Sequence, residues 1–83
     1  MNEVHGLVTG SVQGVGFRAA ARRTAMQYHL KGFVRNLEDG RVEFLVQGSK
    51  PDIETFLATI KHFHVELTWQ VPKKLFPTFE IVL

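Results

Sequence analysis

A glycine-rich turn followed by an arginine is the part of this sequence best able to do chemistry. Gly10, Gly14 and Gly16 lie close together, and Arg18 follows them. Glycine has no Cβ to block a ligand and adopts positive φ, so the backbone N–H groups of the turn can converge on one point. A helix that begins there adds its partial positive charge, and a guanidinium can bind two oxygens of a phosphoryl or carboxylate group. The pattern predicts an anion-binding turn.

The turn differs from the two commonest nucleotide-binding loops. No Gly-Lys-Ser/Thr follows it, as a Walker loop requires. A dinucleotide fingerprint would need a third glycine at the right spacing and an acidic residue downstream, and both are absent. The sequence therefore argues against a mononucleotide kinase or a dehydrogenase.

Length and composition indicate one domain over residues 1–83. The chain is 45% hydrophobic, and seven phenylalanines and one tryptophan supply large side chains for a core. A formal charge of +2 is too small to indicate nucleic acid or membrane partners. The absence of cysteine excludes disulfides and thiolate metal sites and favours a cytoplasmic location. We find no signal peptide and no run approaching the roughly 18 apolar residues of a membrane span.

Hydrophobic periodicity predicts five strands and two helices. The strands are expected over residues 4–10, 32–36, 41–46, 65–71 and 79–83. Asp39-Gly40 between two of them is a strong hairpin signal. One helix is expected from Arg18 to near His29, and a second begins after Ser49 with Pro51 and Asp52 in its first turn. Helical spacing predicts the buried stripe of that second helix as Ile53, Phe56, Leu57, Ile60 and Phe63.

This order, β-α-β-β-α-β with a short final strand, predicts the α+β class. One antiparallel sheet with both helices on one face is the economical way to bury these stripes, which is a ferredoxin-like α/β sandwich. Many unrelated functions share this fold, so the function has to be argued from the site.

Two segments resemble the signatures of the acylphosphatase family. Residues 8–18, Val-Thr-Gly-Ser-Val-Gln-Gly-Val-Gly-Phe-Arg, are similar to the first signature position for position. Residues 32–36, Gly-Phe-Val-Arg-Asn, followed by Gly40, Val42 and Gly48, resemble the second signature at the right spacing. The resemblance covers essentially the whole chain, although the last third is similar in pattern more than in residues.

The resemblance implies a hydrolase acting on acid anhydrides, which splits acyl phosphates into a carboxylate and inorganic phosphate. It implies no metal, no cofactor and no covalent intermediate. Arg18 would bind the phosphoryl oxygens as a catalytic residue, and Asn36 would hold the attacking water. The backbone amides of the phosphate-binding loop would complete the site; its residues are Gln13, Gly14, Val15, Gly16, Phe17 and Arg18.

The sequence departs from the family pattern next to the arginine. The family commonly has a bulky residue directly after it and often a threonine three positions past it. Here these positions hold Ala19 and Ala21. We therefore expect a more open wall on the substrate side and the loss of a polar support. The segment between the second helix and the last strand is also shorter than usual.

Simpler explanations exist for each candidate residue. Arg18 could form a structural ion pair with Glu80 or with the carboxylate of Leu83, and Asn36 could be a turn residue before Asp39-Gly40. His62 and His64 suggest a metal site, but no third ligand is identifiable, so we expect no metal. Glu38 and Asp39 are adjacent in a turn, where paired carboxylates would diverge.

Two other functional classes compete with hydrolysis. Lys31-Gly32-Phe33-Val34 faintly resembles the start of an RNA-binding motif, but Arg35 and Asn36 follow where stacking or apolar residues are needed. We expect no nucleic-acid or membrane partner. A non-catalytic or accessory acylphosphatase-like module of the hydrogenase-maturation type is the alternative. The expected partners are a small acyl phosphate and the phosphate product, and the chain is expected to be a monomer.

Overall fold

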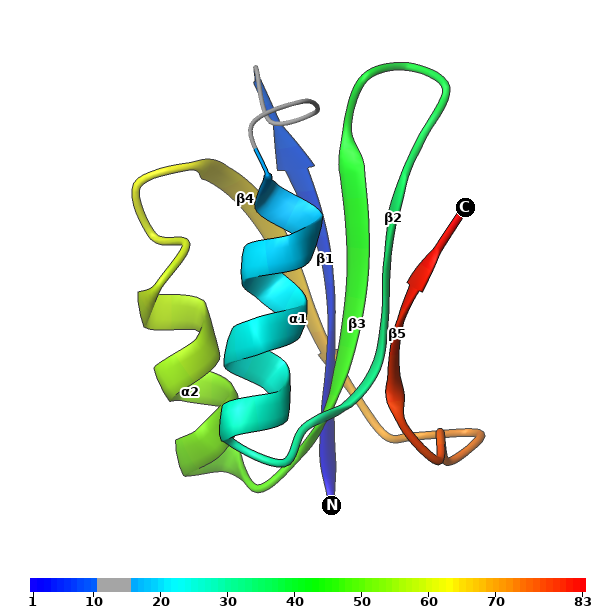
Figure 1. The fold of residues 1–83 in the computed structure, drawn as a ribbon. Coiled ribbons are helices and arrows are strands. Elements are labelled where there is room, and N and C mark those ends of the chain that lie inside the picture. The colour runs from blue at the N-terminus through cyan, green and yellow to red at the C-terminus, as the bar shows by residue number, and fades with distance from the viewer. Residues whose placement is uncertain (11–15) are drawn as a thin grey trace.

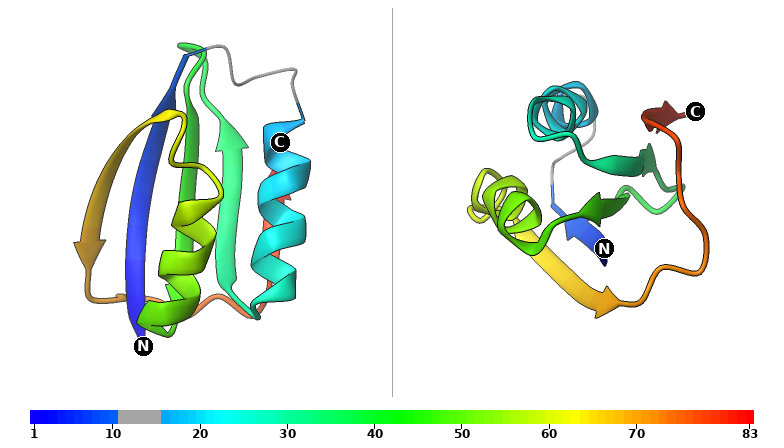
Figure 2. Two further views of the ribbon diagram at one scale, coloured as in Figure 1. Left: turned by 90° about the vertical axis from the view of Figure 1, so that its left-hand side faces the viewer. Right: turned by 90° about the horizontal axis from the view of Figure 1, so that it is seen from below.

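The described residues form one α/β sandwich. A computed structural model describes residues 1–10 and 16–83. Within these ranges the elements follow the order β1 (Asn2–Thr9), α1 (Phe17–Gln27), β2 (Lys31–Asn36), β3 (Val42–Gly48), α2 (Lys50–Ala58), β4 (His64–Gln70) and β5 (Phe79–Val82). Both helices cover the same face of the sheet (Figures 1 and 2). The predicted ferredoxin-like architecture is confirmed.

The sheet has the strand order β4-β1-β3-β2-β5 and is mixed. Strand pairs β1–β3, β1–β4 and β2–β3 are antiparallel, as expected, whereas β2–β5 is parallel. The parallel pair follows from the connection over residues 71–78. Strand β4 finishes at the end of the sheet where β2 begins, and the connection crosses along that end to the far edge (Figure 2). The next strand must therefore run in the same direction as β2.

The core lies between the helices and the sheet. Helix α1 packs on β2 and β5, and α2 packs on β1 and β3. The ring of Phe44 lies directly over Gly6 of β1, where a Cβ would come within 2.1 Å of it. Phe44 also packs edge-on against Phe56 of α2, with ring centroids 5.4 Å apart. No helix in the described ranges is long and apolar enough to cross a membrane.

Helix α2 begins as predicted but ends earlier. The Ser49 hydroxyl accepts a hydrogen bond from the backbone N–H of Asp52, so Ser49 is the N-cap. The predicted stripe continued through Ile60 and Phe63, whereas the helix ends at Ala58. The backbone after Ala58 continues in tighter turns. The amides of residues 59, 60 and 63 each donate a hydrogen bond to the carbonyl three positions earlier. Ile60 still reaches the core through this tighter turn.

A buried glutamine ties the 71–78 connection to the sheet. Gln47 is fully buried, and its Nε2 donates to the Glu3 carboxylate (2.7 Å) and to the Lys74 carbonyl (2.6 Å). Its Oε1 accepts from the backbone N–H of Phe76 (3.0 Å). Glu3 is also buried and accepts a second hydrogen bond from Gln70. A sequence pattern gives no signal for this network, because its members are far apart in the chain.

We predict that Gln47→Ala lowers the free energy of unfolding by about 2–4 kcal/mol, because it leaves buried partners without their hydrogen bonds. Denaturant titration measures the loss. Gln27→Ala, at an exposed helix position, is the matched control and is expected to change stability by less than about 0.5 kcal/mol. A loss for Gln47→Ala no larger than that of the control would contradict this role.

Candidate functional site

The register of the three central strands brings the two predicted catalytic residues to the same end of the sheet. Val42 of β3 pairs with Val8 of β1 on one side and with Asn36 of β2 on the other. Asn36 is thus level with the end of β1, beyond which the chain leads to α1. Alternation along β2 places Asn36 on the same face as the buried Val34, which is the face that α1 covers.

Arg18 lies in the first turn of α1, on the side of the helix that faces β2 and β5. Arg22 and Met26, one and two turns further along the same stripe, line a surface pocket with Phe79 and Glu80 of β5. Arg18 is therefore directed to the side of the sheet that carries Asn36. Its side chain is partly buried. The helix start, Arg18 and the end of β2 together form the candidate site.

The start of α1 is suited to an anion, in contrast to the start of α2. Helix α2 has a side-chain cap from Ser49 and the carboxylate of Asp52 in its first turn. Helix α1 has Gly16 as its N-cap, with no side-chain cap and no acidic residue in the first turn. The first N–H groups of a helix have no intrahelical partner, and they carry partial positive charge. At α1 these groups and Arg18 add their positive charge without a neighbouring carboxylate.

Asn36 has an unsatisfied polar atom at this site. Its Oδ1 is buried and accepts no hydrogen bond within the described part of the chain. A buried oxygen without a hydrogen bond lowers the free energy of unfolding by roughly 1–3 kcal/mol relative to a hydrogen-bonded one. Buried side-chain oxygens in native proteins are therefore usually paired. A turn residue would use its amide for local hydrogen bonds. The orphaned oxygen instead indicates an acceptor available to a bound molecule.

The predicted loop falls partly within the structure. Gln13, Gly14 and Val15 lie outside the described residues. Gly16 adopts a left-handed φ of 76°, which glycine accommodates without strain. The Phe17 side chain is buried, so this residue can offer a ligand only its backbone.

Phe63 was not identified from sequence as part of the site, although its aromatic character is a usable signal. It packs edge-on against Phe17, with ring centroids 5.3 Å apart. This contact holds the first turn of α1 against the segment that follows α2. Phe63 therefore acts as a positioning residue for the helix start.

Ala19 and Ala21 differ in what they contribute. Ala19 is exposed beside Arg18, as an open substrate-side wall requires. Ala21 is buried in the core. A larger polar residue at position 21 would therefore alter the packing of α1 before it altered the substrate side. The two departures from the family pattern have separate consequences.

The alternative explanation for Arg18, an ion pair with Glu80 or with the carboxylate of Leu83, is not found among the described residues. Glu80 accepts a hydrogen bond from the Thr78 hydroxyl (2.7 Å), and none of the ion pairs between described residues includes Arg18. Asp39 behaves as a turn residue, as expected. The Arg41 backbone N–H donates to Asp39 Oδ1 (3.1 Å), and this hydrogen bond lowers the pKa of the Asp39 carboxyl.

His62 and His64 are both exposed. Residues 1–10 and 16–83 contain no group of three or more His, Asp or Glu side chains that could hold a metal ion.

A charged network supports β2 from the opposite face of the sheet. Glu43 Oε2 lies 2.7 Å from His5 Nε2, and Glu43 Oε1 accepts from Arg35 Nε at 2.5 Å. Burial raises the pKa of the Glu43 carboxyl, but the hydrogen bonds from His5 and Arg35 outweigh it and hold the pKa below its usual 4.5. Arg35 precedes Asn36, so this network helps to fix the end of β2.

Comparisons with known proteins identify the family of this chain. A family model described as Acylphosphatase matches residues 4–81. An acylphosphatase from Methylococcus capsulatus is 50% identical over 58 residues, which cover 70% of this chain and 63% of that protein. The chain thus spans less than two thirds of the length of this relative.

Two solved structures share the fold over the full chain. The crystal structure of an acylphosphatase from Bacillus subtilis has a TM-score of 0.94 and 31% identity, with complete coverage of both chains. The crystal structure of HypF from T. kodakarensis has a TM-score of 0.86 and 31% identity, and covers all of this chain but 12% of that one.

The network around Glu43 predicts a pH-dependent stability. Because its pKa is lowered by folding, Glu43 stabilises the fold above its unfolded pKa, and this contribution is lost as pH falls through the folded pKa. We expect Glu43→Gln to be less stable than the wild type at pH 7, with the difference shrinking below about pH 4.5. Denaturant titrations from pH 7 to 3 test this, with Glu38→Gln in the exposed turn as control. A difference independent of pH would contradict the assignment.

The left-handed N-cap predicts a local destabilisation by Gly16→Ala. A Cβ at this position meets no atom of the described residues within 4 Å, so we expect the cost to come from the backbone conformation and to amount to about 1–2 kcal/mol. Denaturant titration measures it. Gly16→Asn, which tolerates left-handed φ better, is expected to recover part of the loss. Equal losses for Ala and Asn would contradict a backbone origin.

Proposed function

Because this chain belongs to the acylphosphatase family, we propose that it hydrolyses the carboxyl–phosphate anhydride of acyl phosphates, giving a carboxylate and inorganic phosphate. The observation that carries this proposal is the buried Oδ1 of Asn36, which has no hydrogen-bond partner among the described residues and lies at the same end of the sheet as the start of α1. An anion-binding helix start explains phosphate binding. An unpaired acceptor beside it adds a place for the attacking water.

Arg18 and the loop amides hold the phosphoryl group in this proposal. The guanidinium binds two non-bridging oxygens, and the backbone N–H groups from Gln13 to Arg18 bind the phosphoryl oxygens with it. Phosphoryl transfer passes through a loose transition state, so positioning and charge stabilisation supply most of the rate. The start of α1 supports this role, because it has no side-chain cap and no acidic residue in its first turn.

Asn36 orients the water. Its Oδ1 accepts a hydrogen bond from the water, which turns a lone pair of the water oxygen toward phosphorus. A new P–O bond forms as the bond to the acyl oxygen breaks, and the electron pair of that bond leaves with the carboxylate. The water proton passes to a phosphoryl oxygen. A neutral amide suits this step because, unlike a carboxylate, it does not repel the anionic substrate.

The reaction is proposed to proceed without a metal ion or cofactor. A carboxylate is a good leaving group and needs no strong general acid. Arg18 and the helix start provide the positive charge that a metal ion supplies in many phosphoryl-transfer enzymes. The cysteine-free sequence likewise supports the proposed cytoplasmic location, which cell fractionation would test.

An accessory module remains the second candidate, since the fold also matches part of HypF. Three observations favour the enzyme over the module. The Methylococcus capsulatus relative is named as an acylphosphatase, and the match to the Bacillus subtilis structure covers both chains completely. The unpaired Asn36 oxygen also has no use in a module that only binds another protein.

Activity of site variants is the direct test. With a generic acyl phosphate such as benzoyl phosphate and EDTA present, we expect hydrolysis that inorganic phosphate inhibits competitively. Arg18→Ala and Asn36→Ala are each expected to lower kcat/KM by at least about 10²-fold, as loss of one transition-state contact does. Arg23→Ala, an exposed arginine on the same helix, is the matched control and should retain activity. Full activity in either site variant, or activity that EDTA abolishes, would overturn the proposal.

Stability separates the functional role of Asn36 from a structural one. Because Oδ1 has no partner among the described residues, Asn36→Ala loses no hydrogen bond of that atom. We expect its free energy of unfolding to change by less than about 1 kcal/mol while activity collapses. A loss of 2 kcal/mol or more, on the order of a satisfied buried group, would instead assign Asn36 to the fold.

A further inference from the structure

A small pocket lies beside the start of α1, on the flank of the helix that faces the segment after α2. Its volume is about 250 Å³. Gly16 and Phe17 line it, and the same two residues form the helix start of the candidate site. Further lining comes from α1 and from the segment after α2, with Ala20, Thr24, Thr59, His62 and Phe63. A group attached to a phosphoryl group at the helix start can therefore reach this pocket.

The lining of this pocket is apolar and carries no fixed charge. Its residues all belong to the described part of the chain, and they include no lysine, arginine, aspartate or glutamate. The Thr59 hydroxyl already donates a hydrogen bond to the Phe56 carbonyl (2.7 Å). His62 is the one titratable residue of the lining, and its exposed ring lies against Phe63, with centroids 4.2 Å apart. An apolar group gains free energy by burial here, whereas a charged group would lose hydration without an opposite charge to pair with.

The direction of the proposed reaction leads to the same flank of α1. In phosphoryl transfer the attacking and leaving oxygens lie roughly in line, on opposite sides of phosphorus. Arg18 and Asn36 lie on the β2 side of the site. Ala20 lies about 200° further around the helix than Arg18, because successive residues of a helix are about 100° apart. The acyl oxygen, opposite the water that Asn36 holds, is thus directed to the flank that carries the pocket.

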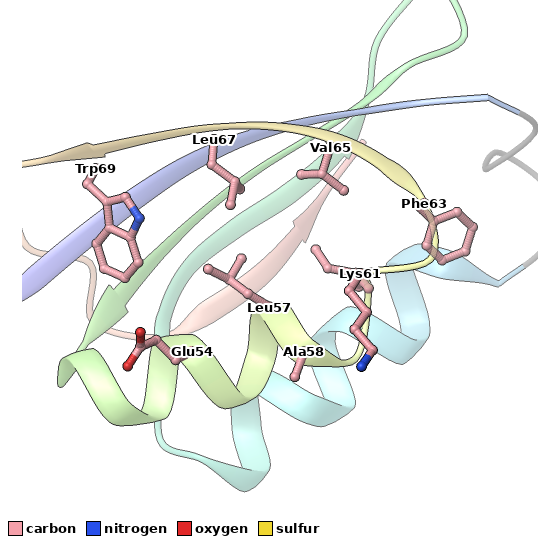
Figure 3. A pocket seen from close by; sticks show the side chains of 9 residues that line it. Glu54, Leu57, Ala58, Lys61, Phe63, Val65, Leu67 and Trp69 are labelled. Carbon is pink, nitrogen blue, oxygen red and sulfur yellow. The ribbon is translucent and has the colours of Figure 1, made fainter.

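Two other hollows beside the helices lack a connection to the helix start. A groove of about 510 Å³ lies between α2 and β4, and Figure 3 shows Phe63 at the end of it that is remote from Trp69. The pocket beside Arg22 and Glu80 has a volume of about 260 Å³. Among the described residues that line these two hollows, neither Gly16 nor Phe17 is present. Neither hollow is placed to receive a group attached to phosphorus.

We propose that the pocket beside the start of α1 binds the acyl group of the substrate, and that the preferred substrates are acyl phosphates with an uncharged, apolar acyl group. This inference rests on the proposed hydrolysis of acyl phosphates. The pocket is smaller than the roughly 300–1,000 Å³ of sites that enclose drug-sized ligands, so it suits one aromatic ring or a short branched chain. Phe63 offers its ring for an edge contact, and the small, exposed Ala20 leaves the pocket open. Ala20 and Phe63 are therefore specificity-determining residues.

Substrate preference tests the pocket. The wild type should hydrolyse benzoyl phosphate with a kcat/KM at least about tenfold above that for succinyl phosphate, whose acyl group carries a carboxylate. Ala20→Leu narrows the pocket at an exposed position, and should lower the ratio of kcat/KM for benzoyl phosphate to that for acetyl phosphate by at least about fivefold. Gln27→Leu, at an exposed position two turns further along α1, is the matched control and should keep the wild-type ratio.

A second alanine distinguishes the pocket from the open wall beside Arg18. Ala19 is also exposed, but it does not line the pocket. If the acyl group lay along this wall instead, Ala19→Leu would lower the benzoyl-to-acetyl ratio and Ala20→Leu would not. That result, or a wild type without preference for benzoyl over succinyl phosphate, would overturn the proposal.

Binding of phosphonates separates a failure of the pocket from a failure of the reaction. Benzylphosphonate and methylphosphonate present an anionic head group, and their P–C bond is not hydrolysed. In NMR spectra of the ¹⁵N-labelled protein, benzylphosphonate should shift the backbone amides of Thr24 and Phe63 at least about twice as far as methylphosphonate does. Equal shifts from both ligands would exclude the pocket and leave the proposed hydrolysis standing. Larger shifts from benzylphosphonate in a protein that cleaves no acyl phosphate would support the pocket and exclude the hydrolysis, and binding of neither ligand would overturn both.

Discussion

The pairing of β1 and β2 on either side of β3 is the constraint on which the site depends. This register puts Asn36 level with Val8, and therefore at the end of the sheet where the chain leads into α1. A slip of one residue in β2 would turn Asn36 to the opposite face of the sheet, away from the helices. The close contact of Phe44 with Gly6 opposes a shift between β1 and β3, because other residues of β1 would carry a Cβ into the ring.

The site differs from the rest of the fold in how polar groups are satisfied. Elsewhere the chain pairs its buried polar groups thoroughly, as Gln47 does with three partners. Helix α2 has both a capping hydroxyl and an acidic residue at its start, whereas α1 has a glycine and no acid. The Oδ1 of Asn36 at the same end of the sheet is the one buried side-chain oxygen or nitrogen in residues 1–10 and 16–83 that has no hydrogen-bond partner. An unpaired buried acceptor costs free energy of folding, which a ligand that completes the hydrogen bonding would recover.

Much of the fold was predictable because its signals are local. Ser49 at the start of α2 and Asp39-Gly40 in the hairpin act within a few residues, and both behave as expected. The parallel pairing of β5 was missed, because it depends on which edge the 71–78 connection reaches. The early end of α2 was missed for a different reason: Ile60 keeps the helical spacing of the apolar pattern while the backbone has already tightened.

For the site, the sequence predicted residue identities better than their surroundings. Arg18 and Asn36 were identified from two motifs, and the fold brings both to one end of the sheet. The sequence did not show that Phe17 can offer a ligand only its backbone N–H. Its side chain packs on Phe63 instead. The network of Glu43 on the opposite face was also unforeseen, since its three residues come from three strands. Long-range contacts of this kind require the register to be known first.

NMR titration of the ¹⁵N-labelled protein with inorganic phosphate would show whether the start of α1 and Asn36 bind one anion. We expect the backbone amides of Gly16, Phe17 and Arg18 and the side-chain amide of Asn36 to shift together and to saturate with one dissociation constant. The amides at the capped start of α2 should not move, which provides a control within the same spectrum. Saturable shifts confined to another surface, or none at the start of α1, would contradict the account.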